Sequence, residues 1–165
     1  MNLQVRISID TALILEELKD AYQKSMGINF SKSDVLIKAV NDTFNEWHTT
    51  SWNNLSVKTK KHEISDGALR PKFSLPYEIE NKIIYFKEIL PKQLTSRSVT
   101  LGVCIKYILK LALFNIQKDK ANTINEIIES SAAKYQSNEY SNETKSAIKD
   151  YMDSILVELE NHQFI

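Results

Sequence analysis

Glycine, cysteine and long apolar runs are all scarce in this sequence, and each scarcity excludes a class of protein. Only three glycines occur in 165 residues, and none lies in a glycine-rich loop that could cradle a phosphate. The single cysteine, Cys104, excludes an intramolecular disulfide framework and suits a reducing compartment, so we expect a cytoplasmic protein. No apolar run approaches the roughly 20 residues of a membrane span, and the N-terminus lacks a signal-peptide pattern, so we expect no membrane association.

The histidines and the cysteine form no recognisable catalytic or metal-binding pattern. His48, His62 and His162 are widely separated, and none has a cysteine or carboxylate at the spacing of a metal ligand set. Cys104 has no histidine near it in the sequence and is better explained as a small buried side chain within a helix. We therefore expect neither an enzyme nor a cofactor-binding protein.

The formal net charge is zero, but the charge is unevenly distributed along the chain. Residues 1–57 carry 5 basic and 7 acidic side chains, residues 58–118 carry 12 basic and 5 acidic, and residues 119–165 carry 4 basic and 9 acidic. The basic middle region suits a phosphate-bearing partner, whereas the acidic C-terminal region does not. Chance and the demands of solubility explain the same distribution equally well.

One alternating segment occurs twice in the chain. Residues 3–9 alternate apolar and polar side chains, and residues 69–75 repeat the pattern 66 positions later. Because successive side chains of a strand point to opposite faces, each segment is expected to form a strand with one apolar and one polar face. We expect the two strands to pair, although Pro71 cannot donate a ladder hydrogen bond and leaves their register open. The apolar faces comprise Leu3, Val5, Ile7 and Ile9 in one copy and Leu69, Pro71, Phe73 and Leu75 in the other.

Helix signals follow the first strand. Asp10 is expected to cap a helix that ends at Gly27. Ser31 and Asp34 stand three residues apart, as in a capping box, and predict a second helix that reaches about Trp47.

The same order of signals follows the second strand. A helix over residues 77–90 is expected to stop at Pro91, and Ser96-Arg97-Ser98 is expected to open the next helix. Aligning this run with Ser31-Lys32-Ser33 gives an offset of 65, one less than that of the strands. Two copies are too few for a solenoid but suit a pseudo-two-fold dimer.

The rest of the sequence joins and extends these two copies. Residues 48–68 are polar and contain the basic run Lys58, Lys60 and Lys61, so we expect a solvated tether, with contacts from these lysines to a nucleic-acid backbone as the alternative. Residues 116–165 contain two amphipathic stripes and predict a helical hairpin.

The repeated order of strand, helix, turn, Ser-basic-Ser and helix resembles the ribbon-helix-helix family of DNA-binding proteins, of the Arc, MetJ and CopG type. The resemblance covers residues 3–47 and 69–114. It implies a mainly α fold in which two ribbon-helix-helix units of one chain form a pseudo-dimer around a two-stranded antiparallel ribbon. The expected divisions are unit 1 at residues 1–47, a linker at 48–68, unit 2 at 69–115 and the acidic helical region at 116–165.

The resemblance also implies roles for particular residues. In the family, outward-facing ribbon residues read bases in the major groove, and the starts of the second helices hold phosphates. An ordinary exposed strand face and ordinary helix capping are the alternatives for these positions. The residues carried over as base-contacting are Gln4, Arg6, Ser8, Arg70, Lys72 and Ser74, and those carried over as phosphate-contacting are Ser31, Lys32, Ser33, Ser96, Arg97 and Ser98.

The expected function is therefore sequence-specific binding of double-stranded DNA without catalysis. A transcriptional repressor and a relaxosome accessory protein at a plasmid origin of transfer fit equally well, the latter with a relaxase as partner. An antitoxin that binds a toxin through residues 116–165, and a purely structural helical protein, remain alternatives. The C-terminal stripe is also expected to serve oligomerisation, through Ile148, Met152, Ile155 and Leu159.

Overall fold

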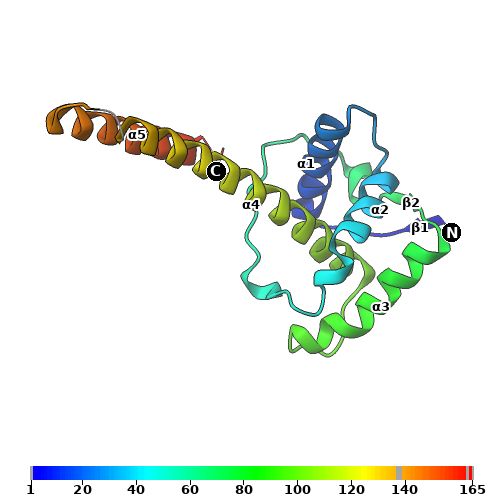
Figure 1. Ribbon diagram of the computed structural model, residues 1–165. Coiled ribbons are helices and arrows are strands. Elements are labelled where there is room, and N and C mark those ends of the chain that lie inside the picture. Colours follow the sequence, from blue (N-terminus) through cyan, green and yellow to red (C-terminus); the bar gives the residue numbers. More distant parts are fainter. Residues whose placement is uncertain (1, 137–138, 163, 165) are drawn as a thin grey trace. The chain divides into compact units, whose positions relative to one another are not determined.

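The computed structural model describes residues 2–136, 139–162 and 164, and it shows a mainly α protein with five helices and a two-stranded antiparallel sheet (Figure 1). The chain divides into two compact units, Met1–Phe114 and Asn115–Ile165. Within the described residues, no helix has both the length and the apolar character needed to cross a membrane. The helices are α1 (Ile9–Met26), α2 (Lys32–Thr43), α3 (Tyr77–Gln93), α4 (Leu101–Gln136) and α5 (Asn142–Asn161).

Strands β1 (Asn2–Gln4) and β2 (Lys72–Ser74) pair antiparallel, which confirms the expected pairing of the two repeated segments. Gln4 stands opposite Lys72, and the ladder continues past the strands because the Val5 N–H donates to the Pro71 carbonyl at 3.2 Å. Since Pro71 has no N–H to return, the ladder has one hydrogen bond fewer at this pair.

The alternation of the two segments matches their burial. Val5, Ile7, Phe73 and Leu75 are buried, whereas the polar side chains between them are exposed. Ile9 is the exception, since it begins α1 and is 59% exposed rather than part of the apolar strand face.

The first helix of each copy starts directly after its strand. The cap of α1 is Ser8 rather than the expected Asp10: the Thr11 N–H donates to the Ser8 hydroxyl at 3.2 Å. Gly27 ends α1 with a φ of 68°, as expected. Pro91 does not stop α3, which continues to Gln93, because a proline near the end of a helix costs only one backbone hydrogen bond.

The second helices differ in how they begin. Ser31 caps α2, and the expected capping box with Asp34 is confirmed. Helix α4 begins only at Leu101, so the expectation that Ser96-Arg97-Ser98 opens it is wrong. The hydroxyl of Thr100 accepts a hydrogen bond from the Val103 N–H at 3.3 Å and takes the capping role.

The two copies correspond at offsets different from those expected from the sequence. Helices α1 and α3 begin 68 residues apart, and α2 and α4 begin 69 apart. Burial follows the same offsets in both pairs. In the first pair, Thr11, Leu15, Leu18 and Tyr22 match Ile79, Ile83, Phe86 and Leu90; in the second, Val35, Leu36, Ala39, Val40 and Thr43 match Cys104, Ile105, Ile108, Leu109 and Ala112.

The segment between the copies, residues 48–68, is packed against them in part: Trp52 and Leu55 are buried, whereas Lys58, Lys60 and Lys61 are exposed, as in the expected tether. Short 3-10 helices lie at Phe44–Glu46 just before it, at Trp52–Asn54 within it and at Asp66–Leu69 at its end. Trp52 is buried, and its indole N–H donates to the Gln93 side chain. The Gln93 amide in turn donates to the Trp47 carbonyl at 3.1 Å. The hydrogen bonds of the Gln93 side chain thus join Trp52 and Trp47 to α3.

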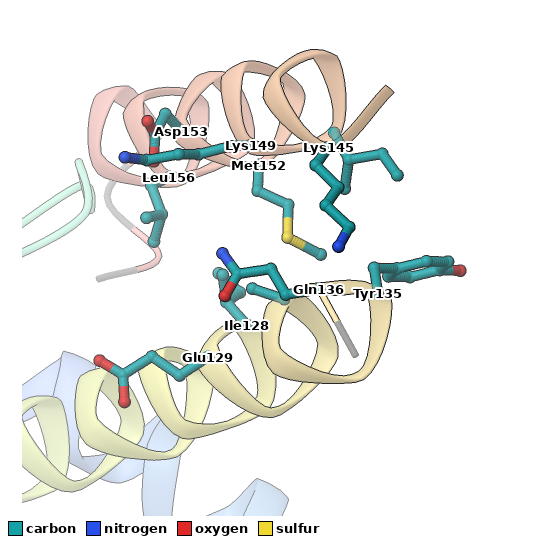
Figure 2. Close-up of a pocket in the computed structure, with 11 residues that line it drawn as sticks. Ile128, Glu129, Tyr135, Gln136, Lys145, Lys149, Met152, Asp153 and Leu156 are labelled. Carbon is teal, nitrogen blue, oxygen red and sulfur yellow. The ribbon is translucent and has the colours of Figure 1, made fainter. Parts of the chain in front are cut away.

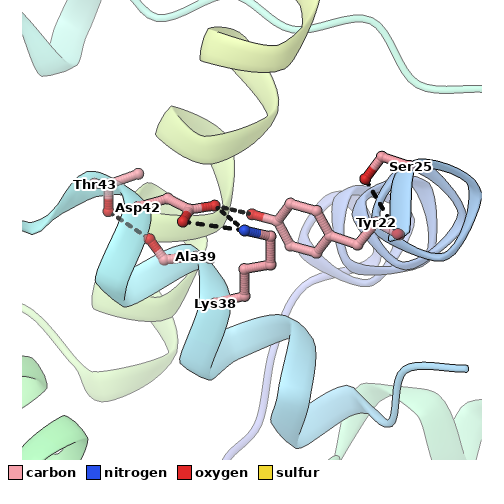
Figure 3. Close-up of polar contacts among 6 residues, drawn as sticks. All are labelled: Tyr22, Ser25, Lys38, Ala39, Asp42 and Thr43. Atoms are coloured by element: carbon pink, nitrogen blue, oxygen red, sulfur yellow. Dashed lines mark hydrogen bonds and ion pairs between the residues drawn. The ribbon is translucent and has the colours of Figure 1, made fainter. Parts of the chain in front are cut away.

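A polar contact ties α1 to α2 (Figure 3). The Tyr22 hydroxyl donates to Asp42 at 3.4 Å, and Lys38 pairs with the same carboxylate at 3.0 Å. Burial, with Asp42 beside it, raises the pKa of Tyr22 well above its usual value. The phenol therefore stays protonated and keeps its role as a donor.

Candidate nucleic-acid interface

The exposed face of β1 and β2, which includes the residues that continue their ladder (5–7 and 69–71), carries a concentration of positive charge. Because the ladder continues through Val5 with Pro71 and Ile7 with Leu69, Arg6 stands directly opposite Arg70. Like charges directly opposite each other destabilise an antiparallel pair. Across the described ranges 2–136, 139–162 and 164, no salt bridge involves Arg6, Arg70 or Lys72. These cations therefore do not stabilise the fold by pairing.

The charge on this face is graded along its length. At one end stand the two arginines, Arg6 and Arg70. At the other end Asn2 stands opposite Ser74, and both side chains are neutral and exposed. Asn2 was missed from the sequence because the strand was expected to begin at Leu3, although the polar alternation extends back to residue 2.

Ser8 occupies the end of the face and is engaged in capping. Its hydroxyl lies 2.9 Å from the Thr11 hydroxyl and accepts from the Thr11 N–H. At the 68-residue offset its counterpart is Pro76, which stands at the N-cap of α3. The two positions are thus alike as helix starts, and Ser8 has less hydrogen-bonding capacity to offer a ligand than an unengaged serine.

The start of α2 lies against β2. The backbone N–H of Ser74 donates to the Ser33 hydroxyl at 2.9 Å, and the Ser31 hydroxyl donates to Asp34 at 2.6 Å. These hydrogen bonds from Ser31 lower the pKa of Asp34, so a negative charge stands at this helix start. Lys32 lies 3.7 Å from Glu16. The three residues at this helix start that were expected to hold a phosphate thus all have protein partners.

The second expected phosphate site lies in a turn. Ser96, Arg97 and Ser98 are exposed and precede α4, and the Ser96 hydroxyl donates to the Ser98 carbonyl at 3.2 Å. At the 69-residue offset, the counterparts of residues 31–33 are Thr100, Leu101 and Gly102. The similarity of the two Ser-basic-Ser runs is therefore not a structural equivalence.

Gly102 places the start of α4 against residues 5–6, which directly follow β1 and continue its ladder. A Cβ at this position would lie closer than 3.0 Å to the Arg6 carbonyl oxygen and 3.5 Å from the Val5 Cγ1. At the same offsets, this contact is the counterpart of the one between Ser33 and Ser74. Each second helix thus begins against the strand next to the polar face, which fixes the backbone of both strands.

Two of the four residues that were expected to serve oligomerisation line a groove within the C-terminal unit. Ile148 and Met152 of α5 line an open groove of about 180 Å³, together with Ile128 of α4 (Figure 2). Ile155 and Leu159 are half-buried. Ile148 and Met152 therefore face the groove between α4 and α5, and oligomerisation through the four residues stays a prediction.

Family models, curated protein sequences and solved structures were compared with the chain, and none of them matches it. Across the part of the chain that the structure describes, no group of three or more His, Cys, Asp or Glu side chains could hold a metal ion.

Proposed function

We propose that this chain binds double-stranded DNA through the exposed face of β1 and β2. The observation that carries the proposal is the cluster of Arg6, Arg70 and Lys72 on one two-stranded face, with two of these cations directly opposite each other. Their mutual repulsion has a cost that a polyanionic ligand would relieve. The proposal includes the fold relationship: residues 1–47 and 69–115 act as two ribbon-helix-helix units of one pseudo-dimer.

The correspondence of the two copies supports the pseudo-dimer. Their helices match in buried positions at offsets of 68 and 69, and each second helix contacts the strand of the facing copy. A two-stranded ribbon alone is marginally stable in water, so it needs helices on its apolar face. Both halves in one chain would remove the concentration dependence of folding that a true dimer has.

The dimensions and chemistry of the face suit the major groove. This groove is about 12 Å wide and admits a two-stranded ribbon. Arginine and lysine donate to guanine O6 and N7, and glutamine pairs with adenine N6 and N7. Arg6 and Arg70 at one end, and Asn2 and Ser74 at the other, make the face unequal about its centre. The preferred DNA site is therefore asymmetric, with guanine favoured at the arginine end.

The experiment that tests binding compares two variants of equal charge. Fluorescence anisotropy with random-sequence duplex at about 0.1 M salt is measured for the wild type and for the variant with Arg6, Arg70 and Lys72 all changed to serine. The control changes the exposed Lys24, Lys87 and Lys92 to serine. We expect the first variant to lose most of its affinity and the control to keep most of it. Equal losses would show that only overall charge matters.

A second comparison separates base contacts from phosphate contacts. Lys32→Ala and Arg97→Ala should each weaken binding to all sequences and reduce the salt dependence of the affinity by about one phosphate contact. Arg6→Ala should instead relax sequence preference at one position of the site, at a cost of about 1–3 kcal/mol for the preferred sequence. Identical behaviour of these variants would contradict this assignment of roles.

Two cytoplasmic uses of such binding fit the residues equally well: repression of transcription, and marking an origin of transfer as a relaxosome accessory protein. Binding to the promoter of the chain's own gene would support the first. Co-purification with a relaxase on transfer-origin DNA would support the second.

A further inference from the structure

A depression of about 210 Å³ lies where the segment between the copies passes α1 and α4. Residues 55–65 of this segment form no helix or strand (Figure 1), and exposed and half-buried side chains alternate along residues 56–60. Parts of the chain that are distant in sequence therefore meet here. The lining residues are Val57 and Thr59 of the segment, Asp10 and Ile14 of α1, and Lys106 and Lys110 of α4.

Glu17 of α1 holds the segment in this place. Its carboxylate accepts a hydrogen bond from the Lys60 backbone N–H at 3.2 Å and lies 3.1 Å from the His62 Nε2. Because the side chains of Glu17 and His62 are only 16% and 22% exposed, solvent screens their contact less than it would on an open surface. The wall that the segment contributes to the depression is thus attached to α1.

Two cations share the depression. Lys106 and Lys110 are four residues apart on α4, so they lie on the same side of the helix, and both are half-buried. Like charges at this spacing destabilise a helix. Among the residues that the structure describes, no salt bridge involves either lysine. Asp10, which also lines the depression, lies in the first turn of α1, where the helix dipole stabilises its negative charge.

The matching place between α2 and α3 shows that this packing does not require the two lysines. At the 69-residue offset their counterparts on α2 are Ile37 and Asn41, which are uncharged. The cation at that place is paired, because Lys82 of α3 lies 2.8 Å from Glu78 and donates to Asn41 at 3.2 Å. The two copies thus have the same helix arrangement, but only one of them places two like charges side by side.

We propose that this depression binds a phosphate group through Lys106 and Lys110. Lysine ammonium groups donate to phosphate oxygens, and an anion between the two would offset their repulsion. The Thr59 hydroxyl on the facing wall can donate to a further oxygen. At about 210 Å³ the depression is smaller than the pockets of drug-sized ligands, so it suits a small anionic group. This group belongs either to a free phosphate compound or to a nucleic-acid backbone.

Equilibrium dialysis of the full chain against labelled inorganic phosphate at low ionic strength tests the free anion. The site variant carries both Lys106→Gln and Lys110→Gln, and the control carries Lys24→Gln and Lys87→Gln, which remove the same charge from exposed positions elsewhere. We expect one phosphate per chain for the wild type and the control, and at least about tenfold weaker binding by the site variant. Changing both site lysines to arginine keeps the charge and should retain binding.

Duplex DNA tests a backbone phosphate at the same place. In this case the salt dependence of the affinity should fall by about one phosphate contact in the site variant and stay unchanged in the control. A loss in either experiment supports the site and identifies the source of the phosphate. A site variant that matches the control in both experiments would overturn the proposal.

Two further observations keep the outcome clear. Circular dichroism shows whether the site variant keeps its helices, and if it does not, Lys110→Gln alone gives the decision in both experiments. A wild type that binds inorganic phosphate but no duplex would overturn the proposed function and leave this site in place. The two proposals can therefore fail separately.

Discussion

Changing Gly102 to alanine tests whether α4 begins against residues 5–6, directly after β1. In an ordinary helix this substitution stabilises the fold, because alanine is preferred over glycine by about 1 kcal/mol. At Gly102 the new Cβ would lie closer than 3.0 Å to the Arg6 carbonyl oxygen. The obstructing atom is backbone, so no side-chain rotation relieves the clash, and either the strand or the helix must shift.

The expected magnitude follows from these two effects. Forcing an extra methyl group into a packed site costs about 1–3 kcal/mol, and the rigid backbone neighbour places Gly102 near the upper end of that range. Subtracting about 1 kcal/mol for helix preference leaves a net loss of about 1–2 kcal/mol. At about 4 °C per kcal/mol, the melting temperature of Met1–Phe114 should fall by several degrees.

Urea denaturation followed by tryptophan fluorescence measures this loss. Trp47 and Trp52 are both buried in the N-terminal unit and report its unfolding. Gly67→Ala is the control, because no atom lies within 4 Å of a Cβ there, and its stability should change by only a few tenths of a kcal/mol. Stabilisation of Gly102→Ala by about 1 kcal/mol would refute the close contact with Arg6.

Four further predictions concern the caps and the buried polar groups. Gly27→Ala should lower the free energy of unfolding by about 1–2 kcal/mol in urea denaturation, because φ is 68°, a left-handed conformation that is strained for alanine. The space around the position is open, so only backbone strain contributes, and a neutral result would show that α1 ends differently. Thr43→Val should lower the free energy of unfolding by about 1–3 kcal/mol, because the Trp47 indole N–H, 3.0 Å from the Thr43 hydroxyl, loses its hydrogen-bond acceptor. An unchanged stability would mean that water takes the place of the hydroxyl. Burial raises the pKa of the Cys104 thiol to about 11, so alkylation at pH 8 should proceed only at the rate of unfolding, and fast labelling of the native protein would contradict its burial. Because the pKa of Asp34 is lowered in the folded state, its carboxylate contributes to the stability of the fold above the ordinary carboxyl pKa, and this contribution is lost as pH falls through the folded pKa. Asp34→Asn should therefore flatten the acid side of a curve of stability against pH, and an unchanged curve would argue against the cap.

Much of the fold was predictable because its signals are local and strong. The alternation in residues 3–9 and 69–75 predicted two strands that pair, and the pairing is confirmed, although Ile9 is exposed and begins α1. Gly27 and the Ser31–Asp34 capping box were identified for the same reason: each requires a particular residue at one position, and the sequence supplies it.

The equivalence of the two copies was only partly predictable. Ser96-Arg97-Ser98 resembles Ser31-Lys32-Ser33 in letters, yet Thr100 takes the capping role, because a serine or threonine can cap a helix anywhere it precedes one. The structural correspondence instead follows burial, where Thr43 matches Ala112 and Tyr22 matches Leu90. Such pairs share a place in the core but not a side chain, so a comparison of residues alone does not find them.

The candidate site was likewise predictable only in part from the sequence. The outward position of Arg6, Arg70 and Lys72 follows from the two-residue side-chain period of a strand. That Arg6 stands opposite Arg70 depends on the strand register, which Pro71 left open. The partners of Lys32 and Ser33 come from α1 and β2, which are distant in sequence. Contacts of this kind depend on the packing of whole helices.

Crosslinking from the centre of the exposed face tests the central claim most directly. Gln4 and Lys72 form the central pair, and a photoreactive side chain placed at position 4 should crosslink to bases of a bound duplex through the major groove. The same group at the exposed position 87 on α3 should give little or no crosslink. Crosslinks from position 87 that equal or exceed those from position 4 would contradict binding through β1 and β2.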